Sequence, residues 1–176
     1  MALSNEKNGT LGILSFASRR GVFPSIGRLH APAIRLERAI ADLSGLKPED
    51  APDDRPWLDH GRWDITHPLG KAETRKGAPR PATDYPFLPV EGESLHQIPV
   101  GPVHAGIIEP GHFRFTAQGE TVVRLEARLG YVHKGIEGLM AGAPLARAAQ
   151  LAARTSGDST VAYSWAFARA AETALG

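Results

Sequence analysis

Residues 154–172 read R-T-S-G-D-S-T-V-A-Y-S-W-A-F-A-R-A-A-E, a short polar turn followed at once by small and apolar side chains. The pattern predicts a helix from Asp158 to Leu175 that is apolar or small on nearly every side between Thr160 and Ala168. A helix without a polar face is normally buried in a larger body. The chain has too little other material to bury it, so we expect a fragment, or one part of a larger assembly.

Two shorter helices are expected before that one, at residues 134–140 and at Pro144 to Arg154. Further upstream, residues 99–130 have the alternation of β structure. Apolar and polar side chains alternate in G-H-F-R-F-T-A (residues 111–117), and E-T-V-V-R-L-E-A-R-L (residues 120–129) continues the alternation after a turn. We therefore predict an α+β fold: a small antiparallel β hairpin or sheet, followed by the start of an Ala-rich helical bundle.

The N-terminal half is expected to hold one helix, from Pro32 to Leu46, which Gly45 is well placed to end in a left-handed cap. Leu36, Ile40 and Leu43 fall on one face of this helix at steps of four and three. We expect that face to be core rather than a partner site.

A long Pro- and Gly-rich segment without regular elements is expected at residues 47–98. Such a stretch is uncommon inside a compact domain. We expect it to wrap over another surface rather than to act as a flexible linker, because it carries large aromatic side chains that could anchor it: Trp57, Trp63, Tyr85 and Phe87. Residues 1–31 are expected to be weakly structured, or to form a strand whose partners lie elsewhere.

The composition excludes several classes of function. The chain has 176 residues, a formal net charge of +1 and no cysteine. The balanced charge gives no footprint for nucleic acid, and thiolate metal sites, disulfides and thiol catalysis are excluded. No signal peptide and no membrane-length apolar run is visible, so we expect a soluble, intracellular chain.

Several sequence blocks resemble the start of the large subunit of membrane-associated nickel–iron hydrogenases of the formate hydrogenlyase (group 4) type. They also resemble the related quinone-pocket (49-kDa) subunit of complex I, the NADH:quinone oxidoreductase. The blocks are I-P-V-G-P-V-H (98–104), E-P-G-H-F-R-F (109–115), G-E (119–120), L-G-Y-V-H-K-G-I-E (129–137) and residues 154–172.

Residues 34–70 resemble the end of the 30-kDa partner subunit of complex I, with E-R-A-I-A-D-L-S-G-L, D-R-P-W-L and H-P-L in order. The resemblance implies two parts. Residues 1–95 would be the tail of a 30-kDa-subunit-like module plus an extended linker. Residues 96–176 would be the head of a hydrogenase large-subunit-like or 49-kDa-subunit-like domain.

The sequence departs from the hydrogenases at Ser156 and Ser159, which fall where that family has a Cys-x-x-Cys pair that binds nickel and iron. A serine hydroxyl does not replace a thiolate toward these soft metals, so a nickel–iron centre is not expected and no metal ligand is assigned. We expect Ser156 to cap the last helix instead. Tyr163 occupies a position at which a histidine is common in the hydrogenases. Gly157 occupies the position of the tyrosine that would help to bind quinone in complex I.

The resemblance suggests site residues from these blocks. His104 matches a loop histidine of the complex I subunit, and Glu109 lies close to a glutamate that relays protons in the hydrogenases; both are assigned as candidate catalytic residues. His104 is also a candidate for cofactor binding, together with His112, Arg154 and Tyr163. The alternatives stay open: Glu109 could be a surface turn residue, and His112, like His133, could be structural. For Arg154, an ion pair that orients its loop is expected.

The function implied by the resemblance is a part of a complex I-like or hydrogenase-like redox complex, peripheral on the inner side of the cell membrane. Electrons would arrive from an iron–sulfur cluster of a small partner subunit and pass to quinone or protons, with membrane subunits as further partners. No cofactor would be held by this chain alone. The alternative is a non-catalytic scaffold homologue in such a complex. A free-standing small binding protein is disfavoured by the apolar last helix.

Overall fold

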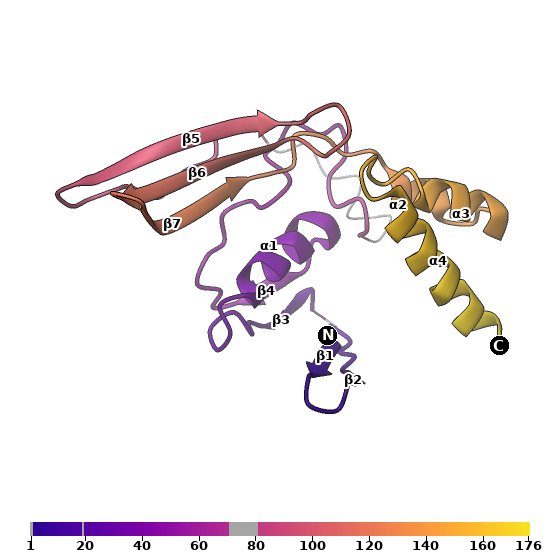
Figure 1. The fold of residues 1–176 in the computed structure, drawn as a ribbon. Helices are drawn as coiled ribbons and strands as arrows, with labels where there is room; N and C mark the ends of the chain where they lie inside the picture. Colours follow the sequence, from indigo (N-terminus) through magenta and orange to yellow (C-terminus); the bar gives the residue numbers. More distant parts are fainter. Residues whose placement is uncertain (1, 19, 71–80) are drawn as a thin grey trace.

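The computed structural model describes residues 2–18, 20–70 and 81–176. A three-stranded sheet extends to one side of a small body that contains the first helix, and three further helices lie at the other end of the sheet (Figure 1). The elements in chain order are β1 (Ala2–Asn5), β2 (Thr10–Ile13), β3 (Val22–Pro24), α1 (Ala33–Ser44), β4 (Lys47–Glu49), β5 (Leu95–Val103), β6 (Gly111–Gln118), β7 (Thr121–Arg128), α2 (Ile136–Met140), α3 (Leu145–Ala152) and α4 (Thr160–Leu175).

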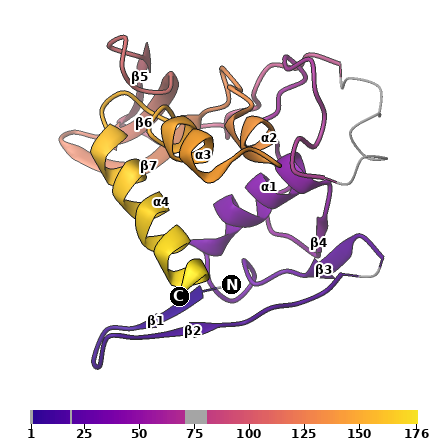
Figure 2. The same cartoon turned by 90° about the vertical axis from the view of Figure 1, so that its right-hand side faces the viewer.

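The N-terminal residues form short strands. β1 and β2 pair antiparallel as a hairpin, which projects from the rest of the chain in Figure 2. β3 pairs in parallel with β4. Only α1 separates these two strands in the sequence, so the partner of residues 22–24 is close along the chain. Of the two expectations for residues 1–31, strand formation is the one observed.

Helix α1, at Ala33–Ser44, lies within the predicted range of Pro32 to Leu46. Pro32 precedes its first residue, and Gly45 ends it at φ 73°, in the left-handed conformation expected for a C-terminal glycine. The predicted core face is wrong: Leu36 is 67% exposed and Ile40 is 38% exposed. The buried residues of the helix are Glu37, Arg38 and Asp42. The charged face of α1 therefore points into the molecule.

Each buried charge of α1 is satisfied by hydrogen bonds, as buried polar groups require. Glu37 accepts from the amides of Ile26 and Gly27, in the loop before the helix. One carboxylate oxygen of Asp42 accepts from three consecutive amides, those of Trp57, Leu58 and Asp59, at 2.8 to 3.2 Å. α1 therefore organises the irregular segment around it through hydrogen bonds to the backbone.

The expected hairpin is confirmed and has a third strand. β6 pairs with β7 and with β5, both antiparallel, in the order β5-β6-β7. Phe115 lies between Ile98 and Leu125 in neighbouring strands, and Phe113 lies two residues along on the same face.

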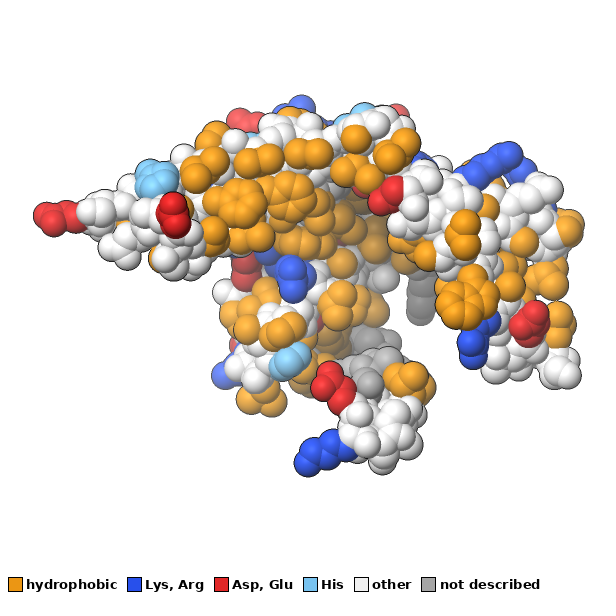
Figure 3. Space-filling model, viewed as in Figure 1, with side chains coloured by type: hydrophobic (Ala, Val, Ile, Leu, Met, Phe, Trp, Pro, Cys, Tyr) orange, Lys and Arg blue, Asp and Glu red, His pale blue; other side chains and the backbone are white. Residues whose placement is uncertain are grey.

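The two faces of this sheet have opposite character. The polar face, which carries Arg114, Arg124 and Glu126, is contacted by residues 87–89 of the chain itself. The apolar face is open to solvent, and its side chains form a hydrophobic area over the strands in Figure 3. Ile98 is 45% exposed and Leu125 is 53% exposed. The chain thus covers the charged face of its sheet and leaves the apolar face uncovered.

The predicted C-terminal helices are confirmed as α2, α3 and α4. α4 packs beside α3 but has no buried residue, and Val161 and Trp165 are 82% and 66% exposed. Among the described residues, no helix combines the length and the apolar character that crossing a membrane requires. The fold is mixed α and β, with a small three-stranded antiparallel sheet and a few helices.

Candidate functional site

Two loops that are far apart in the sequence meet at the base of α4. The first loop, residues 104–109, joins β5 to β6, and the second loop, residues 154–159, joins α3 to α4. The amide of Gly157 donates a hydrogen bond to the carbonyl oxygen of Ile107 at 2.9 Å. A Cβ added to Gly157 would stand 2.9 Å from that same oxygen. The backbones therefore approach more closely than any larger residue at position 157 would permit.

A cleft of about 580 Å³ opens beside these loops. Its wall is mostly apolar and is formed by residues 129–135 after β7, by α2, by α4 and by the irregular segment that follows α1; the polar groups on it include Glu109, Lys134 and Tyr163. The ammonium of Lys134 lies 2.5 Å from the carboxylate of Glu109 and donates to the carbonyl oxygen of Thr155 at 2.9 Å. Lys134 thus connects the first loop to the start of the second.

The serines of the second loop bond to Asp158 rather than to the helix. The hydroxyl of Ser156 donates to Asp158 Oδ1 at 2.6 Å, and that of Ser159 donates to the same oxygen at 3.1 Å. The residue before α4 is Ser159, and its side chain makes no capping hydrogen bond. The expectation that Ser156 caps the helix is therefore wrong. The donated bonds, that from Ser156 first, lower the pKa of the exposed Asp158 carboxyl.

This donor set does not fit a nickel–iron centre. Its oxygens are two hydroxyls that already donate to one carboxylate, whereas such soft metals select sulfur ligands. Among the described residues, no group of three or more histidine, cysteine, aspartate or glutamate side chains is placed to hold a metal ion.

The structure brings together only some of the candidate residues. Glu109 and Tyr163 line the cleft. The exposed His104 lies in the first loop, with Nδ1 2.6 Å from the carbonyl oxygen of Ile108. His112 lies on β6 and contacts the ring of Phe87, with Nδ1 3.3 Å from the Gly101 carbonyl oxygen.

Arg154 is exposed at the start of the second loop. In the described part of the chain the ion pairs do not include Arg154, so its expected orienting pair is not observed. Arg154 does not line the cleft, although the next residue, Thr155, does.

A segment that precedes the site in sequence forms part of its wall. Residues 55–63, the crossing segment, run across the end of β7. His60 is 2% exposed, and its Nε2 lies 3.0 Å from the Leu129 carbonyl oxygen. The indole of Trp63 donates to the Gly130 carbonyl oxygen at 3.1 Å, and its ring contacts that of His133 in a tilted arrangement, with centroids 4.7 Å apart. The predicted anchoring by Trp63 is confirmed.

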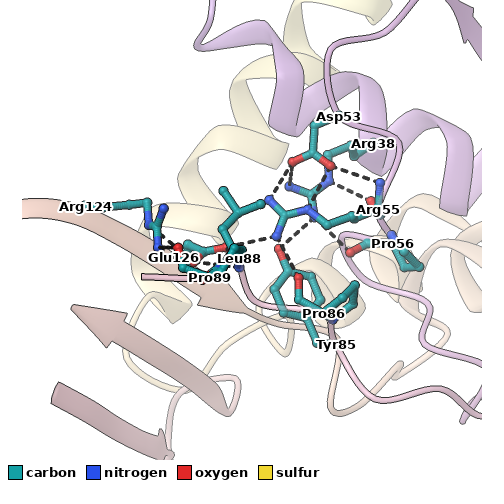
Figure 4. Close-up of polar contacts among 10 residues, drawn as sticks. All are labelled: Arg38, Asp53, Arg55, Pro56, Tyr85, Pro86, Leu88, Pro89, Arg124 and Glu126. Atoms are coloured by element: carbon teal, nitrogen blue, oxygen red, sulfur yellow. Dashed lines mark hydrogen bonds and ion pairs between the residues drawn. The ribbon is translucent and has the colours of Figure 1, made fainter. Parts of the chain in front are cut away.

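Charged side chains fix the start of the crossing segment (Figure 4). Arg55 binds both oxygens of Asp53 and lies 2.9 Å from Glu126 on β7. Arg38 of α1 donates to Asp53 and to the hydroxyl of Tyr85. Burial opposes ionisation of Asp53, but the hydrogen bonds from Arg55 outweigh it and lower the pKa of this carboxyl. These charged groups and the Tyr85 hydroxyl link α1, the crossing segment, residue 85 and β7.

The sequence did not reveal Lys134 or the crossing segment as parts of the site. Lys134 lies 25 positions from Glu109, in a block that resembles known enzymes, but a pattern does not show which carboxylate a lysine meets. The only available signal was that Trp63 is a large aromatic in a Pro-rich stretch, which predicts burial without naming the surface.

Comparison with known proteins gives matches along most of the chain. Residues 2–78 match the family described as respiratory-chain NADH dehydrogenase, 30 Kd subunit. Hydrogenase-4 component G of Escherichia coli is 38% identical over 160 residues, covering 88% of this chain and 29% of that protein. Formate hydrogenlyase subunit 5 of Escherichia coli is 33% identical over 161 residues, covering 88% of this chain and 28% of that protein.

A third relative matches a shorter stretch. Membrane-bound hydrogenase subunit alpha of Pyrococcus furiosus is 31% identical over 80 residues, which is 46% of this chain and 19% of that protein. The chain spans less than a third of the length of each of these relatives.

Proposed function

We propose that this chain is part of the large subunit of a membrane-associated redox complex. Its homology to subunits of complex I-like, group 4 hydrogenases supports this proposal. In this complex, electrons pass from an iron–sulfur cluster in a partner subunit toward quinone. The observation that carries the proposal is the meeting of the first and second loops beside an apolar cleft with an ion pair on its wall.

The chemistry of the cleft suits an apolar ring that carries polar oxygens. The apolar wall would take the ring, and the polar groups would bond to its oxygens. The Tyr163 hydroxyl can donate a hydrogen bond to a quinone oxygen. Glu109, held by Lys134, is placed to exchange a proton when the quinone is reduced to quinol, which takes up two electrons and two protons.

The partners follow from the surfaces that the chain leaves open. The exposed apolar residues of α4 and the uncovered apolar face of the sheet would pack against the iron–sulfur subunit and other parts of the complex. Membrane subunits would hold the complex at the inner side of the cell membrane. The division into residues 1–95 and 96–176 remains a prediction; the matched residues 2–78 fall within its first part.

A non-catalytic scaffold is the second candidate. One observation favours it: the hydroxyls of Ser156 and Ser159 both donate to Asp158, and His104 Nδ1 is taken by the Ile108 carbonyl. These polar groups of the two loops are satisfied within the chain, so fewer remain for a quinone.

The test is quinone reduction by the intact complex that carries Tyr163→Phe or Glu109→Gln, with Glu120→Gln in the exposed β6–β7 turn as a matched control. Loss of a hydrogen bond to quinone should raise KM by about tenfold in Tyr163→Phe. Glu109→Gln should lower kcat by about a hundredfold. Unchanged kinetics in both variants, or an intact complex without quinone reductase activity, would establish the scaffold instead.

A further inference from the structure

The crossing segment and the end of β7 are held together at successive positions. Arg55 pairs with Glu126, His60 bonds to the Leu129 carbonyl, and Trp63 bonds to the Gly130 carbonyl. The contacts thus advance along both parts of the chain in the same direction. They are buried: Glu126 and Trp63 are 8% and 9% exposed, respectively. Since water cannot replace these bonds easily, the position of residues 129–133 depends on the crossing segment.

Two further observations show how tight this contact is. Gly130 has φ 72°, and a Cβ on it would stand 1.7 Å from the carbonyl oxygen of Leu58, so only glycine permits the crossing. The indole of Trp63 makes two contacts: its N–H donates to the Gly130 carbonyl, and its ring lies against the tilted ring of His133. Trp63 thus holds the ring of His133, and His133 is the residue directly before Lys134 in the sequence.

Lys134 continues the connection into the candidate site. Its ammonium contacts both the Glu109 carboxylate of the first loop and the Thr155 carbonyl of the second loop. Both side chains of the ion pair are nearly half exposed, so the pair itself is weak and its geometry depends on where the Lys134 backbone is held. That backbone follows directly after His133 and thus after the contacts of Trp63.

We propose that Trp63 is a positioning residue of the candidate site, which acts through His133 and Lys134 on Glu109 and on the second loop. Its significance for turnover rests on the proposed function, but the physical connection does not. Residues of the 30-kDa-like part thereby fix the geometry of the cleft in the other part of the chain, although Trp63 itself needs no contact with the reacting molecule.

The experiment compares Trp63→Leu and Trp63→Phe with Trp165→Leu in the full 176-residue chain. Trp165 is the matched control, because it is an exposed tryptophan of α4 whose ring centroid lies 5.6 Å from the guanidinium carbon of Arg169. Two NMR signals report the result: the ring protons of His133, shifted by the indole, and the rate of amide exchange at Gly157. Neither signal requires quinone, so failure of the proposed function leaves this test intact.

Trp63→Leu should move the His133 signals and speed amide exchange at Gly157 by about threefold to tenfold. The reason is that the hydrogen bond from the Gly157 amide to the Ile107 carbonyl, a bond of ordinary strength, is loosened. Trp63→Phe keeps a ring on His133 and should lie between Trp63→Leu and the unaltered chain. Trp165→Leu should change neither signal. The proposal is overturned if Trp63→Leu moves His133 but leaves Gly157 unchanged, or if Trp165→Leu has the same effect on Gly157.

If Trp63→Leu does not fold, Lys134→Met tests the proposed connection from Trp63 to the second loop. It removes only the last step, so Gly157 should exchange faster while the His133 signals stay in place, and Lys134→Arg should restore slow exchange. Normal exchange at Gly157 in Lys134→Met would show that Lys134 does not connect the two parts, and the proposal would be wrong.

Discussion

The guanidinium of Arg55 lies 2.9 Å from the carboxylate of Glu126, a residue 71 positions later in the chain. The side chain of Arg55 is 18% exposed and that of Glu126 is 8% exposed, so water screens this pair poorly. The hydrogen bonds that Arg55 donates to Asp53 first, and then to Glu126, raise the pKa of Arg55 above its already high value. The pair joins the irregular segment to the sheet that leads into the candidate site.

Replacing Arg55 by methionine should destabilise the chain by about 3 kcal/mol, because two mostly buried carboxylates lose their shared partner. Urea unfolding of the two proteins measures the difference. Arg28→Met is the control: its pair with Asp50 is exposed on both sides, so its loss should cost less than about 1 kcal/mol. Equal effects of both substitutions would show that burial of the Arg55 pair adds nothing.

The same region shows why sequence reasoning found the elements but not their orientation. Gly45 ended α1 as predicted, because a left-handed cap is a local property of the backbone. The predicted core face of α1 was wrong, because periodicity shows that Leu36 and Ile40 share a face but not what covers it. Here Arg38 is buried instead, since its partners Asp53 and Tyr85 come from distant parts of the chain.

The candidate site was predictable to a similar extent. Resemblance named Glu109 and Tyr163 as candidate site residues, and both line the cleft. The role of Gly157 was visible only in the structure, since its missing side chain matters only because the Ile107 carbonyl lies against it. Contacts of this kind depend on the fold, and no local pattern encodes them.

Gly157→Ala should therefore loosen the contact between the two loops. The added Cβ would stand 2.9 Å from the Ile107 carbonyl oxygen, so one backbone must move and the hydrogen bond between the loops lengthens. We expect a loss of about 1–2 kcal/mol in unfolding free energy and faster amide exchange at residue 157.

Gly138→Ala in α2 is the control for that substitution, since no atom lies within 4 Å of the added Cβ and the residue is helical. This variant should be neutral or more stable by about 0.5 kcal/mol. A stable Gly157→Ala protein with unchanged exchange would contradict the close approach of the loops.

Acidification should weaken the contact of the crossing segment with β7 through His60. Burial first, and then the charge of Arg128, lower the pKa of His60, although the hydrogen bond with the Leu129 carbonyl and the charges of Asp42 and Asp59 oppose this. Between the lowered folded pKa and the ordinary value near 6.5, the unfolded chain binds more protons than the folded chain. The unfolding free energy should therefore fall as the pH drops below about 6.5.

His60→Gln removes this titration and should flatten the dependence of unfolding free energy on pH between 7.5 and 5. Urea titrations at several pH values measure the slope. His30→Gln, at an exposed histidine, should leave the slope as it is. A slope that is unaltered in His60→Gln would assign the pH dependence to other groups.

Ser156→Ala should raise the pKa of Asp158 toward its usual value, because the shorter of the two hydroxyl bonds to that carboxylate is lost. Ser159→Ala should raise it less, since its bond is longer. Carboxyl carbon shifts followed by NMR report both values. Ser164→Ala is the control, because the Ser164 hydroxyl donates to the Thr160 carbonyl instead.

In the intact complex, the double variant Ser156→Ala with Ser159→Ala should keep the same metal content; a loss of bound nickel would contradict the ligand assignment.

Gly130→Ala should be the most damaging of these changes, and Gly135→Ala separates its two causes. Both glycines have positive φ, 72° and 68°, so alanine costs about 1 kcal/mol of backbone strain at either position. Only at Gly130 would the Cβ also overlap the carbonyl of Leu58, at 1.7 Å, whereas nothing lies within 4 Å at Gly135. We therefore expect Gly130→Ala to cost about 3 kcal/mol more than Gly135→Ala in urea unfolding. If the two variants are equally stable, the crossing segment can move aside without cost, and it cannot then be what holds residues 129–134 in place.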